Sequence, residues 1–268
     1  MMTPLNRAVV KISGDDAASF LQGLLTNDIH KVTDNIAIYS CILSPQGKYL
    51  HDLFICRWQD AFFLECDRSK APELIRKLSM YKLRAKVTIE DVSSDYSIFA
   101  LTEACDIAGT KLYADPRHPA MGYRLIAAAG SLHGFSEDAE AYDLRRLTIG
   151  IPEGEKDLLS GEAFPLEYGF DRLQAIDYQK GCYVGQEVTA RTTYRGIVRK
   201  KIYKVTATSP LPAYDTDINA GDSKIGVMRS SHGGIGLALI REEDYTQASA
   251  TGHHPQAGGI AVTLVLPE

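Results

Sequence analysis

The segment KGCYVGQE, residues 180–187, combines residue types that ordinary core packing does not require. A cysteine stands between a glycine and a tyrosine, and Gly185 follows three positions later. Glycines on both sides of Cys182 let the backbone turn tightly and approach a ligand. The ammonium group of Lys180 would favour the thiolate form of the cysteine. The pattern predicts a loop that carries a reactive thiol, with Cys182 and Lys180 as the catalytic candidates.

The cysteine usage of the whole chain sets Cys182 apart. The five cysteines include no CxxC pair, which argues against a disulfide framework and a zinc ribbon and fits a reducing compartment. Three of the others lie inside apolar, β-like runs and are expected to be buried: Cys41, Cys56 and Cys66. His253 and His254 lack a spaced third ligand, so no metal site is predicted.

The composition is that of an ordinary globular protein. With 268 residues and 45% hydrophobic content, the chain can bury the core of one large domain or two modest ones. A formal charge of -5 does not favour wholesale binding to nucleic acid or to an anionic membrane. No run approaches the ~20 apolar residues of a membrane span. Because the first residues resemble neither a signal peptide nor a transit peptide, we expect a protein of the cytoplasm.

The first half of the chain alternates strand and helix patterns. Apolar spacing predicts helices within residues 13–29 and 70–86, the first capped by Asp15 or Asp16. The turn SPQG, residues 44–47, separates two β-like runs and predicts a hairpin. Further strands are expected at residues 7–12, 61–66, 87–92 and 96–102. This half of the chain is therefore expected to be α+β.

The second half begins with a helix and ends in short strands. Ser136 is placed to begin the helix and Gly150 to follow its end. The segment 180–187 is expected in a loop, and QEVTARTTYRG, residues 186–196, is expected to form a short helix closed by Gly196. From Ile197 onward, short β-like runs alternate with Gly, Pro, Asp and Ser turns, which predicts a small all-β barrel or sandwich.

Four motifs in order carry a family resemblance. They are FLQGLLTNDI at residues 20–29, SPQGKYLHDLFI at 44–55, GIPEGEKDL at 150–158 and KGCYVGQEVTARTTYRGIVRKK at 180–201. Together they resemble the landmarks of the YgfZ family, which is related to the T-protein of the glycine cleavage system. The last motif is especially similar to the mitochondrial branch of the family, which serves iron–sulfur assembly.

The resemblance implies both a fold and a role. The fold would be a T-protein-like arrangement of two interleaved α+β subdomains around a central cavity in residues 1–195, followed by a small antiparallel β-barrel in residues 196–268. The cavity would bind tetrahydrofolate or a derivative of it. The role would be the maturation of [4Fe–4S] proteins, including radical enzymes that modify tRNA. It would be performed in the bacterial cytoplasm, or in the mitochondrial matrix of a eukaryote.

Two positions depart from the T-protein pattern. T-proteins carry paired aspartates where this chain has His51 and Asp52, and a carboxylate near the place of Thr148. Aminomethyl transfer needs a carboxylate that orients the folate nitrogen and polarises the donor. Aminomethyl transfer is therefore not expected, and Asp52 stays a candidate for binding the cofactor. Whether the chain has any catalytic turnover stays open.

The resemblance also gives the loop residues a ligand. The amino group and ring nitrogens of a pterin can form paired hydrogen bonds with an amide or a carboxylate, and an aromatic ring can stack on it. The alternatives are a helix start at Gln186 and Glu187, and core packing of Tyr183. The cofactor-binding candidates in the loop are Gly181, Tyr183, Gly185, Gln186 and Glu187.

A basic cluster follows the loop in this acidic chain. It is either a solvated face or a cationic lip that attracts the glutamyl tail of a folate or an acidic client protein. Arg191 is placed among the cofactor-binding candidates on the second interpretation. The cluster consists of Arg191, Arg195, Arg199, Lys200, Lys201 and Lys204.

Together these patterns predict a tetrahydrofolate-binding accessory protein for the assembly or repair of [4Fe–4S] proteins, with Cys182 as the reactive residue. One alternative is a folate-dependent one-carbon transferase. The other is a protein- or RNA-binding adaptor, against which the net charge and the lack of an RNA-binding motif argue. The expected partners are folate, the iron–sulfur assembly machinery and client [4Fe–4S] enzymes, with neither a membrane nor direct binding of nucleic acid.

Overall fold

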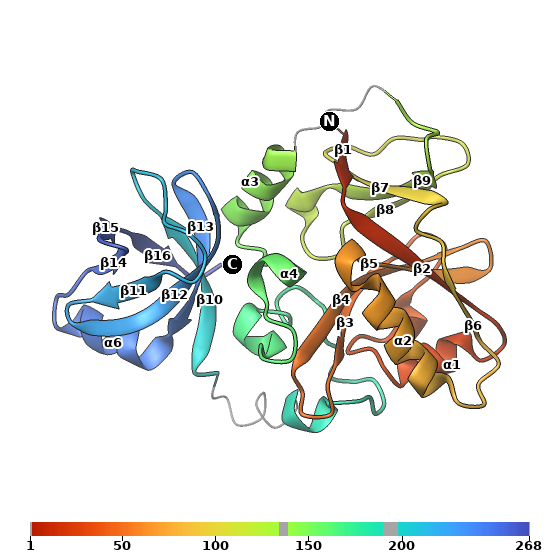
Figure 1. Ribbon diagram of the computed structural model, residues 1–268, viewed down its shortest axis with the longest axis horizontal. Coiled ribbons are helices and arrows are strands. Elements are labelled where there is room, and N and C mark those ends of the chain that lie inside the picture. The colour runs from red at the N-terminus through yellow and green to blue at the C-terminus, as the bar shows by residue number, and fades with distance from the viewer. Residues whose placement is uncertain (1, 134–138, 190–197, 268) are drawn as a thin grey trace. The chain divides into compact units, whose positions relative to one another are not determined.

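The computed structural model describes residues 2–133, 139–189 and 198–267 (Figure 1). The chain forms two compact units. The first consists of Met1–Ala139 and Leu173–Val188, and the second of Glu140–Arg172 and Thr189–Glu268. The domain boundary predicted near residue 195 lies outside the described residues and stays a prediction, as do the expected helix start at Ser136 and helix end at Gly196.

A five-stranded antiparallel sheet forms the centre of the first unit. Its strand order is β3 (Ile38–Leu43), β4 (Tyr49–Trp58), β5 (Ala61–Asp67), β2 (Arg7–Ser13) and β6 (Thr88–Asp91). The hairpin predicted around the SPQG turn is confirmed as β3 and β4. Pro45 and Gly47 supply its tight turn, where the N–H of Gly47 donates to the carbonyl of Ser44 at 2.8 Å.

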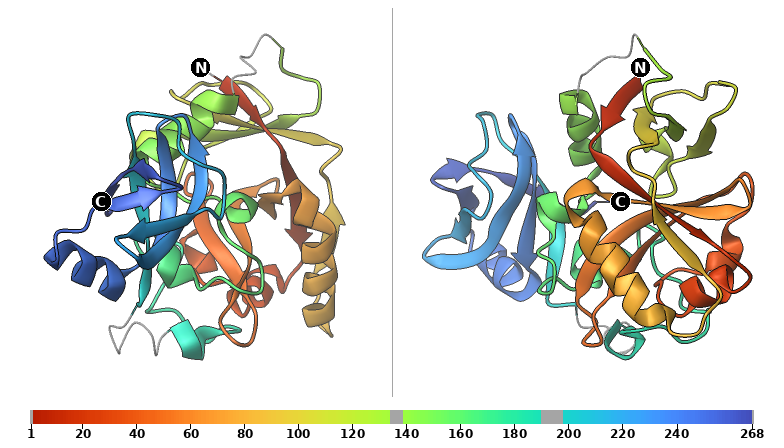
Figure 2. Two further views of the ribbon diagram at one scale, coloured as in Figure 1. Left: turned by 60° about the vertical axis from the view of Figure 1, so that its left-hand side comes forward. Right: turned by 45° about the vertical axis from the view of Figure 1, so that its right-hand side comes forward.

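Helices α1 (Ala17–Gln22) and α2 (Ala71–Lys82) cover one face of this sheet, and α2 lies across it in Figures 1 and 2. Leu21 of α1 and Leu74 of α2 are fully buried against strand residues such as Leu53. Both predicted helices are therefore confirmed. Asp16 stands at the N-cap position of α1 as expected, but its carboxylate makes no cap hydrogen bond and instead accepts from the N–H of Lys86 at 2.7 Å.

The first unit holds a second antiparallel sheet with the order β1 (Met2–Leu5), β7 (Tyr96–Leu101), β9 (Tyr123–Ala128) and β8 (Lys111–Ala114). Among these strands, the sequence pattern predicted only β7. Because β1 leads directly into β2, the chain passes from one sheet into the other within the first 13 residues. The α+β class expected for this half is confirmed.

The second unit contains a seven-stranded antiparallel sheet. In chain order its strands are β10 (Lys200–Thr206), β11 (Asp217–Ala220), β12 (Ser223–His232), β13 (Ile235–Arg241), β14 (Pro255–Ala257), β15 (Ile260–Ala261) and β16 (Thr263–Val265). The sequence predicted strands only in this part and missed α6 (Glu242–Ala250). Three acidic residues in the first turn of α6 favour the positive end of its dipole.

The rest of the second unit precedes the sheet in sequence. It includes α3 (Ala139–Ile149) and α4 (Gly154–Asp157). Gly150 follows α3 with a φ of 89°, as its place after the helix predicted. This part also holds a short 3-10 helix at Pro165–Tyr168, and three more lie in the first unit, at Ile29–Lys31, Arg68–Lys70 and Pro119–Met121. Within the described part of the chain, no helix is long and apolar enough to cross a membrane.

Candidate functional site

Lys180 anchors the segment 180–187 to the end of helix α1. Its ammonium Nζ donates to the backbone carbonyls of Gln22 at 2.8 Å, Leu25 at 2.6 Å and Asn27 at 2.9 Å. The side chain is buried, and burial lowers its pKa to about 8. Since these carbonyls use all three ammonium hydrogens, Lys180 fixes the position of the loop. Its predicted effect on the Cys182 thiol stays a prediction.

Thr26 and Asn27 hold the chain that leads into this loop. The hydroxyl of Thr26 donates to the carbonyl of Ala175 at 2.7 Å. The side-chain amide of Asn27 donates to the carbonyls of Tyr39 at 2.8 Å and Gln174 at 2.7 Å. The TND motif therefore ties strand β3 to the approach of the loop, across about 150 residues of sequence. In the sequence, Thr26 and Asn27 stand out only as part of the family motif FLQGLLTNDI.

The two glycines of the loop differ in their surroundings. Gly185 has a φ of 84°, and a Cβ there would lie 2.5 Å from the carbonyl oxygen of Ser44 and 2.9 Å from the Cβ of Leu43. Only glycine fits at this position, where the loop packs on the β3–β4 hairpin. A Cβ at Gly181 would meet nothing within 4 Å. The predicted backbone requirement is confirmed for Gly185, whereas Gly181 lies in open space.

Cys182 is the exposed cysteine of this chain. Cys41, Cys56 and Cys66 are buried as expected, and burial raises the pKa of each thiol to about 12. Cys105 is half-buried. Because thiolate chemistry needs both access and ionisation, Cys182 is the best-placed cysteine for reaction.

The remaining loop candidates divide between the interior and the surface. Tyr183 is 8% exposed, and its ring centroid lies 5.1 Å from Nζ of Lys180, so its ring packs in the interior. Gln186 and Glu187 begin a helical turn at residues 186–189, with Gln186 half-buried and Glu187 exposed. These two side chains are the loop groups that can reach a polar ligand. Arg191 and Arg195 lie outside the described residues.

His51 and Asp52 face opposite sides of strand β4. His51 shares the face of Leu53, which belongs to the core under α1 and α2, and it is 2% exposed. Neither of its ring nitrogens has a hydrogen-bond partner among the described residues. Burial lowers the pKa of His51 to about 4, against the effect of Glu73 on α2. The histidine at the first position of the T-protein pair is therefore part of the core.

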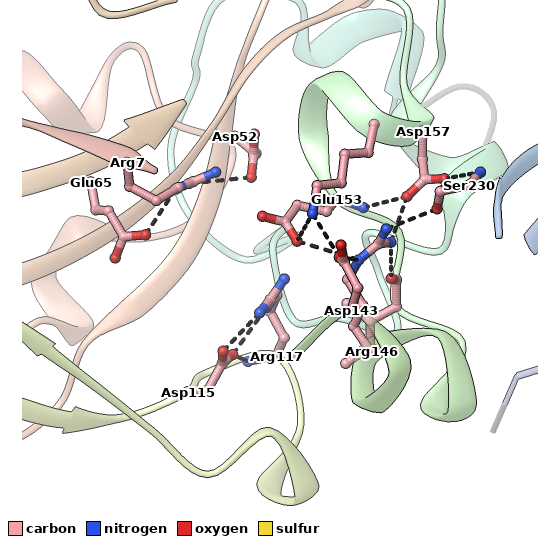
Figure 3. A network of polar contacts seen from close by, with 12 residues as sticks. Arg7, Asp52, Glu65, Asp115, Arg117, Asp143, Arg146, Glu153, Asp157 and Ser230 are labelled. Atoms are coloured by element: carbon pink, nitrogen blue, oxygen red, sulfur yellow. Dashed lines mark hydrogen bonds and ion pairs between the residues drawn. The ribbon is translucent and has the colours of Figure 1, made fainter. Parts of the chain in front are cut away.

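Asp52 lies on the other face, where two phenols hold its carboxylate. The hydroxyl of Tyr39 donates to Oδ2 at 3.1 Å, and the hydroxyl of Tyr49 donates to Oδ1 at 2.9 Å. Arg7 forms an ion pair with Oδ2 at 3.6 Å (Figure 3). Asp52 is 1% exposed. A ligand would have to displace at least one of these groups in order to touch the carboxylate directly.

A buried ion network surrounds Asp52, and the sequence analysis missed it. Glu65 pairs with Arg7 at 2.8 Å and with Arg124, whose Nε donates to it at 2.9 Å. Arg117 donates to Asp115 through Nε at 3.0 Å and Nη2 at 2.8 Å (Figure 3). The available signal was a charged residue inside an apolar strand run, as in AFFLEC and YRLIAA.

The arginines and carboxylates of this network neutralise one another. The guanidinium groups of Arg124, Arg117 and Arg7 lie 3.7, 4.7 and 5.3 Å from the ring centroid of Phe54. Burial by itself would raise the pKa of Glu65, but Arg124 and Arg7 outweigh it and hold that pKa below its usual value. Glu65 and Asp115, whose pKa values are both held below their usual values by neighbouring arginines, thus stay ionised beside a cation, as buried charges require. The network joins the two sheets of the first unit.

The motif GIPEGEKDL forms a second buried network, inside the second unit. Arg146 of α3 donates to Asp157 at 2.8 Å and to Asp143 at 2.7 Å (Figure 3). Asp157 also accepts from the N–H of Ser230 on β12 at 2.9 Å. The motif therefore ties α3, α4 and β12 together. Thr148 lies away from this network, exposed, and donates to the carbonyl of Leu144.

The basic cluster is only partly available to a ligand. Lys201 pairs with Glu242 at 2.6 Å, while Arg199 is exposed and Lys200 and Lys204 are half-buried. Among the described residues, no group of three or more histidine, cysteine, aspartate or glutamate side chains is arranged to hold a metal ion.

Two family profiles match the chain. The GCVT N-terminal domain matches residues 6–103, and the C-terminal beta-barrel domain of CAF17 matches residues 199–268. A crystal structure of the glycine cleavage system aminomethyltransferase T from Bartonella henselae superposes with a TM-score of 0.71 and 12% identity, over 98% of this chain and 84% of that one. The predicted T-protein-like fold with a C-terminal antiparallel barrel is confirmed.

Three relatives in sequence are each named as the iron-sulfur cluster assembly factor IBA57 or a homologue of it. The iron-sulfur cluster assembly factor IBA57, mitochondrial, of Mus musculus is 34% identical over 298 residues, which cover 98% of this chain and 83% of the relative. The protein of the same name from Homo sapiens is 34% identical over 88% of this chain and 76% of its own length. The homologue from Mycosarcoma maydis is 34% identical over 96% of this chain and 68% of its own length.

Proposed function

Because this chain belongs to the family of the iron-sulfur cluster assembly factor IBA57, we propose that it assists the assembly or repair of [4Fe–4S] proteins, with Cys182 as its reactive residue. Radical enzymes that modify tRNA are among the proposed clients. The more distant likeness to the bacterial YgfZ proteins stays a prediction.

The exposed thiol of Cys182 is the observation that carries this proposal. It lies on a loop that Lys180, Thr26 and Asn27 anchor to the body of the first unit. An anchored loop presents the thiol in one place, which a free tail would not do. The three buried cysteines are protonated at neutral pH because their pKa values are about 12.

A single cysteine restricts the chemistry. Iron–sulfur clusters are generally held by four protein ligands, so Cys182 would contribute one ligand to a cluster whose other ligands come from a partner. The thiol loses its proton when it binds iron, and the cluster is cargo rather than a resident cofactor of this chain. The partner is therefore an iron–sulfur assembly protein or a client enzyme.

Tetrahydrofolate binding is the second part of the proposal. The T-protein-like fold supports it, and Gln186 and Glu187 would be the loop groups that contact the pterin. Asp52 would act behind them, since its carboxylate is already engaged by Tyr39 and Tyr49. Gly181, Gly185, Tyr183 and Arg191 stay in the proposed cofactor site, with Gly185 and Tyr183 shaping its backbone and its floor.

A one-carbon transferase of the T-protein kind would need a second carboxylate, which this chain lacks at the position of the aspartate pair. His51 takes the first place of the T-protein aspartate pair, and its side chain is buried in the core. With Asp52 alone, the arrangement favours binding of the folate over aminomethyl transfer. The adaptor alternative rests on the basic cluster, in which Lys201 is already paired with Glu242.

The proposed location follows the printed names of the relatives, which are mitochondrial proteins. In a eukaryotic cell we place the protein in the mitochondrial matrix, and in a bacterium we place it in the cytoplasm. Both are reducing compartments, in which the free cysteines stay reduced.

A complementation experiment tests the proposal. In a deletion strain with low [4Fe–4S] enzyme activity, the unaltered gene should restore activity, and Cys182→Ser should not. Serine is close in size but its hydroxyl stays protonated, so the substitution removes thiolate chemistry and spares the shape. Cys105→Ser, at the half-buried cysteine, is the matched control and should complement fully. Full complementation by Cys182→Ser would make the cysteine structural.

A further inference from the structure

Helix α2 and the turn after it expose two large apolar side chains. Met80 is 72% exposed and Leu83 is 88% exposed, while Leu74 and Leu78 on the other side of the helix are fully buried. Leu83 has a φ of 45°, in a region that disfavours any side chain with a Cβ. Leu83 therefore adopts a costly conformation and buries nothing within its own chain.

Unpaired cations surround these two side chains. Residues 70–86 contain six basic residues and one acidic residue, in a chain whose formal charge is -5. Among the described residues, Arg76, Lys77, Lys82 and Arg84 have no ion-pair partner. Elsewhere in the chain the large buried cations are neutralised, as Arg146 is by Asp157. Cations without an ion-pair partner are therefore concentrated on α2 and the turn after it.

Arg76 and Met80 share one side of helix α2, and Leu83 directly follows its end. The first two are four residues apart, so they lie together on the solvent-facing side of α2, and Leu83 lies in the turn after it. The other three basic residues flank them. We call this the α2 surface; it consists of Arg76, Lys77, Met80, Lys82, Leu83 and Arg84.

We propose that the α2 surface docks an acidic segment of a partner protein whose apolar side chains cover Met80 and Leu83. Carboxylates of the partner would pair with the four cations, which gives orientation and a fast encounter, and the apolar contact would slow dissociation. The proposal goes beyond the role of Cys182, because it names a docking surface on a different element of the chain.

Two other occupants fit the surface less well. A two-fold dimer would place the same cations opposite each other, which is repulsive. An anionic membrane would take up the positive charge, but stable binding to a membrane also needs substantial burial of apolar area, and two side chains offer little. An acidic protein satisfies both the charge and the small apolar centre.

A pair of peptide probes tests the proposal on the full-length protein. The first is a fluorescent helical peptide with two leucines flanked by glutamates, and the second has serines in place of the leucines. We expect the leucine peptide to bind at least tenfold more tightly in fluorescence anisotropy titrations. Met80→Ser with Leu83→Ser should abolish this preference. Leu159→Ser with Val265→Ser, at other exposed apolar positions, should keep it.

The charge contribution is tested separately. Glutamine substitutions at four positions should lower the affinity for both peptides at least tenfold at low salt. The positions are Arg76, Lys77, Lys82 and Arg84. The matched control removes the same charge at surface cations outside residues 70–86 that already have carboxylate partners: Lys11, Arg57, Lys224 and Arg241. The thermal unfolding of each variant is measured first, since all these side chains lie at the surface and their replacement should leave the fold intact.

Four results would overturn the proposal. The first is no binding of either peptide, and the second is a leucine preference that persists in the Met80→Ser, Leu83→Ser variant. The third is binding to vesicles with anionic phospholipid that the same variant loses, which would assign the surface to a membrane. The fourth is self-association in sedimentation that this variant abolishes, which would assign it to a second copy of the chain.

Discussion

The ammonium group of Lys180 is held by three backbone carbonyls, at 2.6 to 2.9 Å. Hydrogen bonds of this kind satisfy carbonyls at and after the C-terminal end of helix α1. The residue before Cys182 is a glycine with open space around it, so nothing but the anchors on either side restrains the thiol. The accuracy with which the chain presents Cys182 depends on Lys180 and Gly185.

Replacement of Lys180 by methionine should lower the free energy of unfolding by about 2 kcal/mol, because it leaves buried carbonyls without a donor. Urea denaturation measures the loss, and Lys86→Met at an exposed position is the control. The pH profile of Cys182 alkylation by iodoacetamide is the second measurement. If the midpoint of alkylation moves to higher pH in the variant, Lys180 also favours the thiolate of Cys182 electrostatically. If the free energy of unfolding does not change, Lys180 does not anchor the loop.

His51 makes stability depend on pH. Its pKa is about 4 in the folded chain and near 6.5 when unfolded, because the folded chain buries it. As the pH falls below 6.5, the unfolded chain binds the proton first, so stability is lost between pH 6.5 and pH 4. The groups that act on this ring from α2 and its neighbours are Glu73, Asp52, Lys77 and Lys70.

The expected loss is about 3 kcal/mol, from a pKa difference of about 2.5 units. His51→Leu should remove this part of the pH dependence, seen as a smaller difference between urea denaturations at pH 7 and pH 4. His254→Leu, at an exposed histidine, should behave like the unaltered protein. Identical pH slopes for His51→Leu and the unaltered protein would show that His51 is solvated or partnered.

At the scale of elements, buried ion pairs and hydrogen bonds fix the orientation of helices and strands that apolar contacts alone would not fix. In the second unit the carboxylate of Asp157 accepts from Arg146, from the N–H of Glu153 and from Ser230. Hydrogen bonds are directional, so this carboxylate fixes how α3 and α4 lie on β12. The family motif GIPEGEKDL is in this respect a structural motif.

Asp157→Asn should destabilise the second unit by about 3 kcal/mol, because an amide cannot accept at both ends and leaves the buried guanidinium of Arg146 underpaired. The decrease should appear in urea denaturation followed by a probe in that unit. Asp171→Asn, at an exposed carboxylate, is the control. A loss as small as that of the control would mean that Asp143 and Glu153 alone suffice for Arg146.

At the scale of the whole molecule, a T-protein-like fold carries a buried histidine, His51, where the resemblance expects the first of two aspartates. We expect the protein to bind tetrahydrofolate in isothermal titration calorimetry, and to form only background methylene-folate when it is combined with the other glycine cleavage components. Glu187→Gln should weaken folate binding by about tenfold through loss of a charged hydrogen bond. Glu243→Gln on α6 is the control.

Two outcomes would revise this prediction. Absence of binding to any reduced folate would remove folate from the proposed function and leave the role of Cys182 untouched, because complementation measures that role independently. Robust turnover would promote the one-carbon transferase, and would require the buried carboxylate of Asp52 to become accessible during the reaction.

The sequence by itself determined the elements whose signals are local. The β3–β4 hairpin follows from Pro45 and Gly47 between two apolar runs, and helix α2 from the spacing of Leu74 and Leu78. The loop character of residues 180–185 and the need for glycine at Gly185 also follow from residue types that permit a tight turn. Each of these depends on neighbours within a few residues.

Only the tertiary structure decided where charged side chains find their partners. Arg7 and Arg124 meet at Glu65 across 58 and 59 residues, and Thr26 reaches Ala175 across 149. It also showed that the Lys180 ammonium binds carbonyls, and that His51 lies in the core while Asp52 faces the ion network. Such pairings depend on how sheets and loops pack, because desolvation forces every buried charge to a partner that the linear order does not name.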